Sequence, residues 1–358
     1  MMAEWESCGA VLLAMPHADS DWNSILPRAI AQYRRLLAAL TANGENCILL
    51  APDAAEALEM LSAPLPSGEL GAYMSDDQLK RISIVEMPTN DTWTRDYGPI
   101  SAVRCGRLRA LDFGFNAWGL KFAADRDNLV NRRLAEKLVI RPDAYRNESD
   151  FILEGGSVET DGQGTLLTTS KCLLSPNRNG GLSKAEAGEE LSRRLGVDHI
   201  LWLDYGHLEG DDTDSHIDTL CRMAPGNTIL FTGCRNMDDP HFEDLLHMRA
   251  QLTLFRTAEG NPYNLVELPL PDPVYNEEGD RLPATYANYL VTEKCIYMPV
   301  YNQPANDRLA CQTVRVAFPD HKVVPVECTT LLEQHGSLHC STMQLARGLV
   351  LEGQKETR

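Results

Sequence analysis

Four short segments concentrate the side chains that could carry chemistry, and each follows an apolar run typical of a strand. They are NDTWTRDYGP (90–99), EGG (154–156), GHLEGDDTDSHIDTL (206–220) and LEQHGSLHCSTMQ (332–344). Folds that alternate helices and strands place their sites in the loops where strands end. An ordinary solvated loop is the alternative for any one segment. Cys, His, Asp and Glu in four such segments favour a shared site.

Cys340 is the candidate nucleophile. It follows His339 and a turn at Gly336, and the residues after it, STMQLARG, predict a short helix. A thiol at a helix N-terminus has a lowered pKa, which favours the reactive thiolate. A buried and inert cysteine is an equal alternative for Cys340, and it is the preferred interpretation for the other nine cysteines.

Three further residues are candidates for proton transfer or cation binding. His216 and Asp218 lie in DSHIDTLCRM, whose alternation predicts a strand with both side chains on one face. The exposed polar face of an edge strand is an equal alternative for that pair. Asp96 stands beside Trp93 in WTRDYGP, and a carboxylate next to an aromatic ring suits a flat cation. Trp93 as a plain core residue is the alternative.

The sequence predicts no metal and no nucleotide cofactor. Neither GxGxxG nor GxxxxGK[ST] occurs. One group of two histidines and a cysteine has spacing typical of metal ligands, but no second pair of Cys or His residues lies nearby. One run of aspartates resembles a calcium loop in charge, but it lacks the Gly and the Glu of that loop. These two groups are His335, His339 and Cys340, and Asp211, Asp212 and Asp214.

The elements that must position these residues recur along the chain. Six amphipathic stretches each lead into a strand-like run, a change of period from about 3.6 to about 2. These steps are 27–43 into 47–52, 75–81 into 82–88, 128–138 into 151–156, 183–195 into 199–204, 241–257 into 264–271, and 306–317 into 322–327. Hairpins are predicted at 100–113, 156–169 and 286–299. Because no linker divides the sequence, we expect a single α/β domain over residues 1–358.

The chain has 358 residues and a formal net charge of −18. This acidity disfavours nucleic acids and anionic membranes as partners, since both require a basic surface. It suits a cationic substrate, although solubility explains most of it. The start, MMAEWESCGA, has no signal-peptide pattern, and ten scattered cysteines favour reduced thiols, so we expect a cytoplasmic protein.

Several longer blocks together resemble one family. They are WTRDYGP, LEGGSVETDGQGTLLTT, CLLSPNRN, GDDTDSHID and GSLHC, joined by AEWE (3–6), FNAWG (115–119) and ATYANYL (284–290). From about residue 3 to about residue 350 the sequence resembles the agmatine deiminase and bacterial peptidylarginine deiminase family of guanidine-modifying enzymes. The resemblance implies a pentein fold, a five-bladed α/β propeller with its site in the central channel. Five blades must then accommodate six helix-to-strand steps.

The same resemblance implies hydrolysis of a guanidinium to a urea with release of ammonia, without metal or cofactor. It implies Cys340 as nucleophile and His216 as general acid and base. Asp96 and Asp218 would grip the guanidinium, and Glu154 would assist at the substrate nitrogens or orient His216. Trp93 and Trp118 are the candidate aromatic residues of the substrate site. A homodimer is compatible with the resemblance.

We therefore expect an agmatine deiminase that forms N-carbamoylputrescine through a covalent thiouronium, in putrescine and polyamine biosynthesis. One alternative is deimination of free or peptidyl arginine, for which Arg95 or Arg178 could contact a carboxylate, although pairing with acidic residues is the preferred interpretation for both. A catalytically silent binding module and a metal-dependent hydrolase are alternatives of other classes. The segment Gln334-His335-Gly336 replaces a glycine run frequent in the family, and Leu120 replaces a frequent glycine. Positions 335–337 are therefore candidates for contacting the far end of the substrate.

Overall fold

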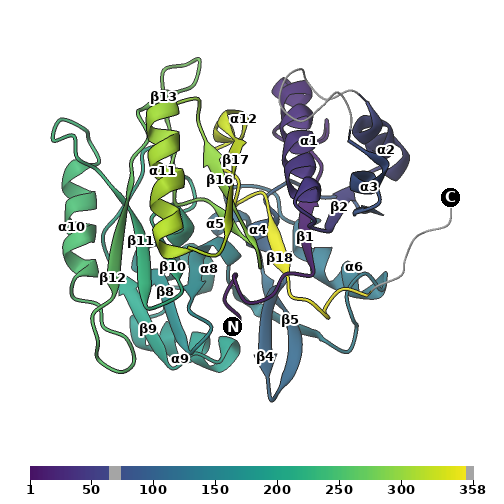
Figure 1. Cartoon of the computed structure of the whole chain (residues 1–358). Coiled ribbons are helices and arrows are strands. Elements are labelled where there is room, and N and C mark those ends of the chain that lie inside the picture. The colour runs from purple at the N-terminus through teal and green to yellow at the C-terminus, as the bar shows by residue number, and fades with distance from the viewer. Residues whose placement is uncertain (64–73, 352–358) are drawn as a thin grey trace.

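Five mixed sheets share one strand pattern in the computed structural model, which describes residues 1–63 and 74–351 (Figure 1). In each sheet an antiparallel pair is followed by a parallel strand. The first sheet has the order β18-β1-β2-β3. Its strands are β1 (Ala10–Ala14), β2 (Cys47–Ala51), β3 (Ile82–Glu86) and β18 (Met343–Leu345).

The other four sheets have three strands each, in chain order. They are β4 (Ile100–Arg104), β5 (Arg107–Gly114) and β6 (Tyr145–Ile152); β7 (Val158–Thr160), β8 (Thr165–Thr169) and β9 (His199–Leu203); β10 (Cys221–Ala224), β11 (Thr228–Gly233) and β12 (Asn264–Pro269); and β15 (Leu290–Val291), β16 (Cys295–Val300) and β17 (Lys322–Glu327). A separate ribbon pairs β13 (Val274–Tyr275) with β14 (Arg281–Leu282). The three predicted hairpins are confirmed as β4-β5, β7-β8 and β15-β16.

A helix precedes a parallel strand at all six predicted steps, but the strand of the third step is Tyr145–Ile152 and not 151–156, because residues 155–157 form a 3-10 turn. The helices of these steps are α1 (Leu26–Ala42), α3 (Asp76–Leu79), α6 (Val130–Glu136), α9 (Lys184–Leu195), α10 (Phe242–Leu252) and α11 (Pro304–Ala317). Six steps fit five sheets because β2 and β3 both belong to the first sheet. The shorter elements are α2 (Ala54–Ser62), α4 (Thr94–Tyr97), α5 (Ala117–Leu120), α7 (Ser170–Leu173), α8 (Pro176–Asn179), α12 (Thr329–Leu332) and the 3-10 turns η1 (Asn23–Ile25), η2 (Asp127–Leu129), η3 (Gly155–Ser157) and η4 (Ile217–Thr219).

Local sequence signals explain the longer helices. The predicted capping box of α9 is present, with Ser183 accepting from Glu186 N while the Glu186 side chain accepts from Ser183 N. Gly196 ends α9 in the left-handed conformation that glycine adopts without strain. In α1, Leu36 and Leu40 are fully buried, and each such side chain contributes about 1.5–3 kcal/mol to folding. Helix formation is thus driven by caps and by one apolar face.

Two predicted elements near the candidate residues are wrong. The chain around Asp218 forms η4 rather than a strand, because Asp214 and Ser215 before it have positive φ values of 66° and 65°. A strand requires negative φ at both residues. No helix forms between Cys340 and Leu351, where the described part of the chain ends. That stretch instead enters β18, whose antiparallel pairing with β1 satisfies the backbone groups that a helix would have used.

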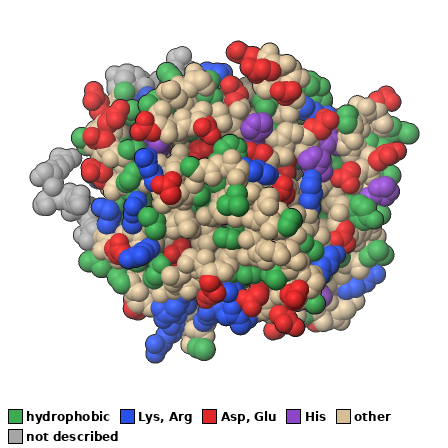
Figure 2. All heavy atoms as spheres, turned by 180° about the vertical axis from the view of Figure 1, so that it is seen from behind, with side chains coloured by type: hydrophobic (Ala, Val, Ile, Leu, Met, Phe, Trp, Pro, Cys, Tyr) green, Lys and Arg blue, Asp and Glu red, His purple; other side chains and the backbone are tan. Residues whose placement is uncertain are grey.

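Acidic side chains are spread over the face shown in Figure 2, with Lys and Arg interspersed among them and also grouped at its lower edge. Within residues 1–63 and 74–351, no helix combines the length and the apolar character needed to cross a bilayer.

Candidate active site

Five connections between consecutive sheets supply the residues of one site. These residues are Asp96 between β3 and β4, Glu154 between β6 and β7, His216 and Asp218 between β9 and β10, Asn288 between β14 and β15, and Cys340 between β17 and β18. The sequence predicts all of them except Asn288. The site therefore draws one connection from each junction between the five sheets, and it forms only when the whole chain has folded.

The thiol of Cys340 is buried, with 6% of the residue exposed. Its Sγ lies 3.2 Å from Asn288 Nδ2 and 3.8 Å from Asp218 Oδ2. Burial raises the pKa of the Cys340 thiol well above its usual value, and the carboxylates of Asp218 and Asp96 raise it further. A helix N-terminus does not lower it, contrary to the sequence-based prediction. A cation bound beside these carboxylates would favour the thiolate instead.

Two donors fix the carboxylate of Asp96. Trp118 Nε1 donates to Oδ2 at 3.0 Å, and Gly156 N donates to Oδ1 at 2.9 Å. Burial raises the pKa of Asp96 to about 6, and the charge of His216 opposes that rise. Asp96 is therefore ionised at neutral pH but loses its charge as the pH falls below about 6.

Three polar groups approach one another around Gly156. His216 Nδ1 lies 3.5 Å from Asp96 Oδ1. A Cβ on Gly156 would lie 2.7 Å from each of these two atoms, closer than real Cβ contacts, and 3.1 Å from Asp218 Oδ2, tighter than most. Glycine at this position leaves the space in which a base and two carboxylates converge.

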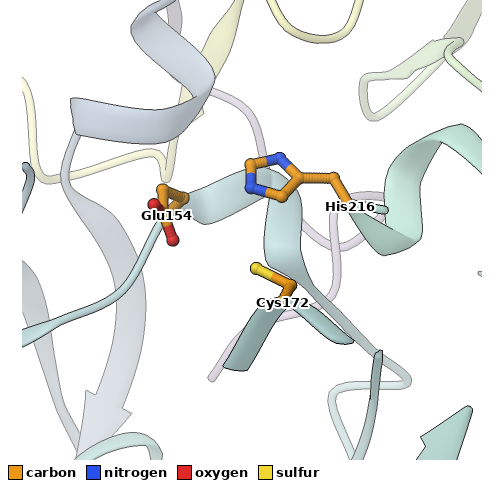
Figure 3. A group of neighbouring side chains, drawn as sticks. All are labelled: Glu154, Cys172 and His216. Atoms are coloured by element: carbon orange, nitrogen blue, oxygen red, sulfur yellow. The ribbon is translucent and has the colours of Figure 1, made fainter. Parts of the chain in front are cut away.

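The imidazole of His216 lies beside Cys172 and Glu154, toward which one edge of the ring points (Figure 3). One nitrogen, sulfur or oxygen atom of each residue lies within 4.8 Å of the others. Burial alone would lower the pKa of His216, but Asp96, Cys172 and Glu154 raise it well above its ordinary value. Neither ring nitrogen has a hydrogen-bond partner within the described residues, so His216 can donate a proton to a group that enters the site.

Arg178 links Glu154 to the loop that carries His216. Its Nε donates to Glu154 Oε1 and Oε2 at 2.9 Å and 3.0 Å. Its Nη1 donates to Asp214 Oδ2 at 2.6 Å, and its Nη2 donates to Thr213 O at 2.9 Å. Asp214 has a positive φ, and such backbone conformations persist where surrounding contacts hold them. Arg178 is therefore a structural partner of the site, as the sequence favours.

Asp218 is oriented by two neighbours and keeps one oxygen free. Its Oδ2 lies 2.7 Å from His339 Nδ1 and accepts from Asn288 Nδ2 at 3.2 Å. Its Oδ1 is buried and has no hydrogen-bond partner within the described residues. Burial would raise the pKa of Asp218, but the hydrogen bond and charge of His339 lower it below its usual value. Asp218 thus presents an ionised oxygen that lacks a donor.

A pocket with about 490 Å³ of empty space reaches Asp96 and Cys340. Its lining is made of Asp21, Asp91, Trp93, Asp96, Trp118, Phe122, Asp212, Thr213, Thr219, Gln334, His335, Gly336 and Cys340. Four lining residues are aspartates, and none is a lysine or arginine. Trp93 lies so close to Gly336 that a Cβ there would be 2.2 Å from the ring. The pocket combines aromatic walls with negative charge, which suits an elongated cation.

A family model described as Porphyromonas-type peptidyl-arginine deiminase matches residues 1–346 of this chain. The chain belongs to this family. A solved structure of C. jejuni agmatine deiminase, a cysteine-to-serine variant with substrate bound, is 36% identical, with a TM-score of 0.86 and 97% and 96% of the two chains covered. A Porphyromonas gingivalis structure, provisionally assigned as an arginine deiminase, is 38% identical, with a TM-score of 0.88 and 98% and 99% covered. A Shewanella sp. (strain MR-4) protein, named provisionally as an agmatine deiminase, is 31% identical over 97% of this chain and 94% of its own.

Two groups of side chains in this member of the deiminase family have the composition of a metal site. They are Glu154, Cys172 and His216, and Glu4, Glu159 and His339. In each cluster an arginine already supplies the positive charge, Arg178 to Glu154 in the first and Arg222 to Glu159 and Glu4 in the second. A bound dication would have to compete with that guanidinium, so these residues fit a metal ion poorly.

Asn288 and Arg222 are contacts of the site that the sequence does not reveal. Asn288 lies within ATYANYL, a block that resembles the family, but an asparagine between an alanine and a tyrosine gives no chemical signal of its own. Arg222 is fully buried and donates to Ala287 O at 3.1 Å and to Tyr289 O, on either side of Asn288. A buried arginine in the strand-like run CRMA is not predictable from local pattern.

Proposed function

We propose that this protein is an agmatine deiminase, which hydrolyses agmatine to N-carbamoylputrescine and ammonia. The observation that carries the proposal is the charge of the pocket. Four aspartates line the pocket that contains Cys340: Asp96 is buried, Asp91 and Asp212 are partly buried, and Asp21 is exposed. Agmatine carries a guanidinium at one end and an ammonium at the other, so both ends would meet carboxylates.

In this proposal Asp96 and Asp218 bind the guanidinium. Buried cations require carboxylate partners, and paired contacts hold the guanidinium plane. The free Oδ1 of Asp218 and the fixed carboxylate of Asp96 support this assignment. Trp93 and Trp118 form the walls beside it.

Cys340 is the proposed nucleophile and His216 the proposed acid and base. The bound cation favours loss of the Cys340 proton to solvent, and the thiolate attacks the guanidinium carbon to give a neutral tetrahedral adduct. Protonated His216 then donates to one amino group, ammonia leaves, and a thiouronium remains on sulfur. His216 next accepts a proton from water as the water oxygen attacks the same carbon. Collapse of this second adduct expels the ureido product and the thiolate, and the remaining hydroxyl proton passes to the released ammonia. The C. jejuni agmatine deiminase structure that holds a substrate is a cysteine-to-serine variant, which supports a cysteine nucleophile.

Glu154 is proposed to orient His216. Its carboxylate is fully buried, both of its oxygens accept from Arg178 Nε, and one of them lies within 4.8 Å of a ring nitrogen of His216. Of the two roles expected from the sequence, this position favours orientation of the base over contact with the substrate nitrogens.

Free or peptidyl arginine is the second candidate substrate, favoured by the family description and the P. gingivalis relative. Such a substrate has a carboxylate or a peptide group at its far end. Arg95 and Arg178 are both engaged, Arg95 with Glu4 and Arg178 with Glu154. The lining offers His335 as its only group that can carry positive charge. Agmatine therefore fits the pocket better.

We also propose that the five sheets stand as blades around one axis within a single domain. The support is the regular supply of one site connection from each junction between sheets. The product, N-carbamoylputrescine, is one carbamoyl hydrolysis away from putrescine, which suits a role in polyamine synthesis. A cytoplasmic location and a homodimer remain expectations from the sequence.

A ureido-product assay tests the proposal. Purified protein is incubated with agmatine, arginine and a peptidyl arginine, each with and without a chelator, and Cys340→Ala serves as the control. We expect kcat/KM to be highest for agmatine, unaffected by the chelator, and no turnover by Cys340→Ala. Preference for arginine would overturn the substrate, and turnover by Cys340→Ala would overturn the nucleophile. A wild-type protein that bound agmatine without product would indicate a binding module.

A further inference from the structure

Glu4 brings a carboxylate from the N-terminal segment into the network behind the site. Its Oε1 accepts from Arg95 Nη1 at 2.9 Å and lies 2.8 Å from His339 Nε2. Its Oε2 accepts from Arg222 Nη2 at 2.8 Å. Burial would raise the pKa of Glu4, but the charges of Arg95, His339 and Arg222 hold it well below its usual range. Glu4 is thus ionised, with three donors on two oxygens.

His339 stands between this carboxylate and Asp218. The residue is 1% exposed, and its Nδ1 lies 2.7 Å from Asp218 Oδ2. A carboxylate only accepts hydrogen bonds, so Nδ1 is placed to donate to Asp218. Nε2 faces both Glu4 Oε1 at 2.8 Å and Arg222 Nη2 at 3.2 Å, and of these two only the carboxylate can accept from it. The imidazole therefore connects Glu4, which does not line the pocket, with one oxygen of Asp218 inside the site. His339 also immediately precedes Cys340.

The connection determines which oxygen of Asp218 is available. With Oδ2 held by His339 and Asn288, only Oδ1 is left without a partner. If His339 turned or changed its donor atom, Oδ2 would be released and the carboxylate could rotate. A guanidinium bound through two nitrogens is sensitive to such a rotation, because its donors form a rigid fork.

We propose that Glu4 is a positioning residue that acts through His339 to hold Asp218 in the orientation that binds the guanidinium. The role rests on the proposed function, because it presumes that Asp218 contacts a guanidinium. Glu4 is not among the residues that line the pocket and forms no hydrogen bond with Cys340 within the described chain. The sequence places it in AEWE, a block of the family resemblance, and in none of the four segments that concentrate the chemical side chains.

Glu4→Gln is the sharpest variant. Gln has nearly the same shape but one acceptor oxygen, and its amide hydrogens would face at least one of the donors from Arg95, Arg222 and His339. Glu159→Gln is the matched control. Glu159 is also buried and also pairs with Arg222, yet no hydrogen bond joins it to His339 within the described chain.

The test measures binding of methylguanidine by calorimetry, with each variant placed in the inactive Cys340→Ala background. Because Glu4→Gln removes a hydrogen-bonded charge partner, we expect it to raise the Kd of methylguanidine ten- to hundredfold. The Kd for Glu159→Gln should stay within about twofold of the Cys340→Ala reference. In the active background we expect Glu4→Gln to raise KM for agmatine more than it lowers kcat. Thermal unfolding of all variants is recorded alongside. A purely structural role predicts equal losses for Glu4→Gln and Glu159→Gln, and that result would overturn the proposal.

A double-mutant cycle with His339→Gln keeps the test decisive if Glu4→Gln also loses stability. If Glu4 acts through His339, adding Glu4→Gln to His339→Gln weakens methylguanidine binding no further. Additive losses would show that Glu4 acts by another route and would contradict the proposal. Because methylguanidine binding needs no turnover, a wrong substrate would overturn the proposed function and leave this role standing. Absence of methylguanidine binding in the reference protein would overturn both.

Discussion

Asp96 and Asp218 are two carboxylates in one buried site, yet their surroundings shift their pKa values in opposite directions. Burial raises the pKa of Asp96 to about 6. Burial acts the same way on Asp218, but the hydrogen bond from His339 reverses the shift and lowers that pKa. One acid therefore titrates within the range in which enzymes are assayed, while the other stays ionised. The pair can hold a cation only while both are charged.

The pH dependence of kcat/KM follows from Asp96. Above about pH 6 the carboxylate is ionised and attracts a cationic substrate, and below it the neutral acid does not. We expect kcat/KM for agmatine to fall about tenfold per unit as the pH drops below 6, measured in a constant-ionic-strength buffer series. A profile that stays flat down to pH 5 would contradict the assignment of Asp96.

Replacing Cys340 by serine should abolish turnover, by at least about 10⁴-fold, since a hydroxyl ionises far less readily than a thiol. Binding should persist, because Asp96 and Asp218 are unchanged. The measurement combines the ureido-product assay with calorimetry of agmatine. Full activity of Cys340→Ser would remove Cys340 from the reaction.

The turn that carries Trp118 is an unusual element. Four consecutive residues from Ala117 to Leu120 have positive φ values of 51°, 54°, 88° and 69°, a left-handed conformation that costs non-glycine residues about 1–2 kcal/mol each. The turn aims Trp118 Nε1 at Asp96. Strain of this kind persists where it serves a site.

Leu120 is 74% exposed, so its side chain contributes little packing that would offset this cost. We expect Leu120→Gly to stabilise the protein by about 0.5–1 kcal/mol in denaturant unfolding, the relief of φ strain less the entropy of glycine. Leu129→Gly is the control, because Leu129 is also exposed but has a φ of −106°. Leu129→Gly should destabilise the protein, because glycine brings its entropic cost and relieves no strain there. The same sign for both variants would contradict this account of the turn.

A substitution at Gly156 tests how closely the proposed catalytic groups pack. Gly156→Ala would place a methyl group 2.7 Å from Asp96 Oδ1 and His216 Nδ1, and we expect kcat/KM to fall more than about 100-fold, as misplacement of reacting groups does. Gly188→Ala in α9 is the control, because a Cβ there would meet only Ile200, at 3.7 Å. It should leave kcat/KM unchanged and stabilise the protein by up to about 1 kcal/mol. Equal activity of both variants would refute the convergence at residue 156.

Periodicity predicts the elements well and the site loops poorly. The six helix-to-strand steps, the hairpins and the α9 capping box are local patterns, and the structure contains them. The strand predicted around His216 fails because Arg178 and Asp211 hold positive φ values there through long-range and loop contacts. The helix predicted after Cys340 fails because β18 pairs with β1, more than 300 residues away in sequence. Such tertiary contacts leave no local pattern.

The charge of the whole molecule bears on substrate capture. A net charge of −18 and a pocket lined by four aspartates create a field that attracts cations. We expect kcat/KM for dicationic agmatine to fall about two- to tenfold between 20 mM and 500 mM salt, because ions screen this field. The Kd of monocationic methylguanidine for Cys340→Ala should change less. Equal sensitivity would show that the far end of agmatine meets no negative charge.

The central claim is that Cys340 attacks the guanidinium carbon of agmatine. Acid quenching during the first turnover, followed by mass spectrometry of the digested protein, tests it most directly. We predict an adduct with the mass of agmatine less ammonia on the peptide that contains Cys340, absent when Cys340→Ala is treated identically. Ureido product formed without any adduct, or an adduct on another residue such as Cys172, would contradict the claim.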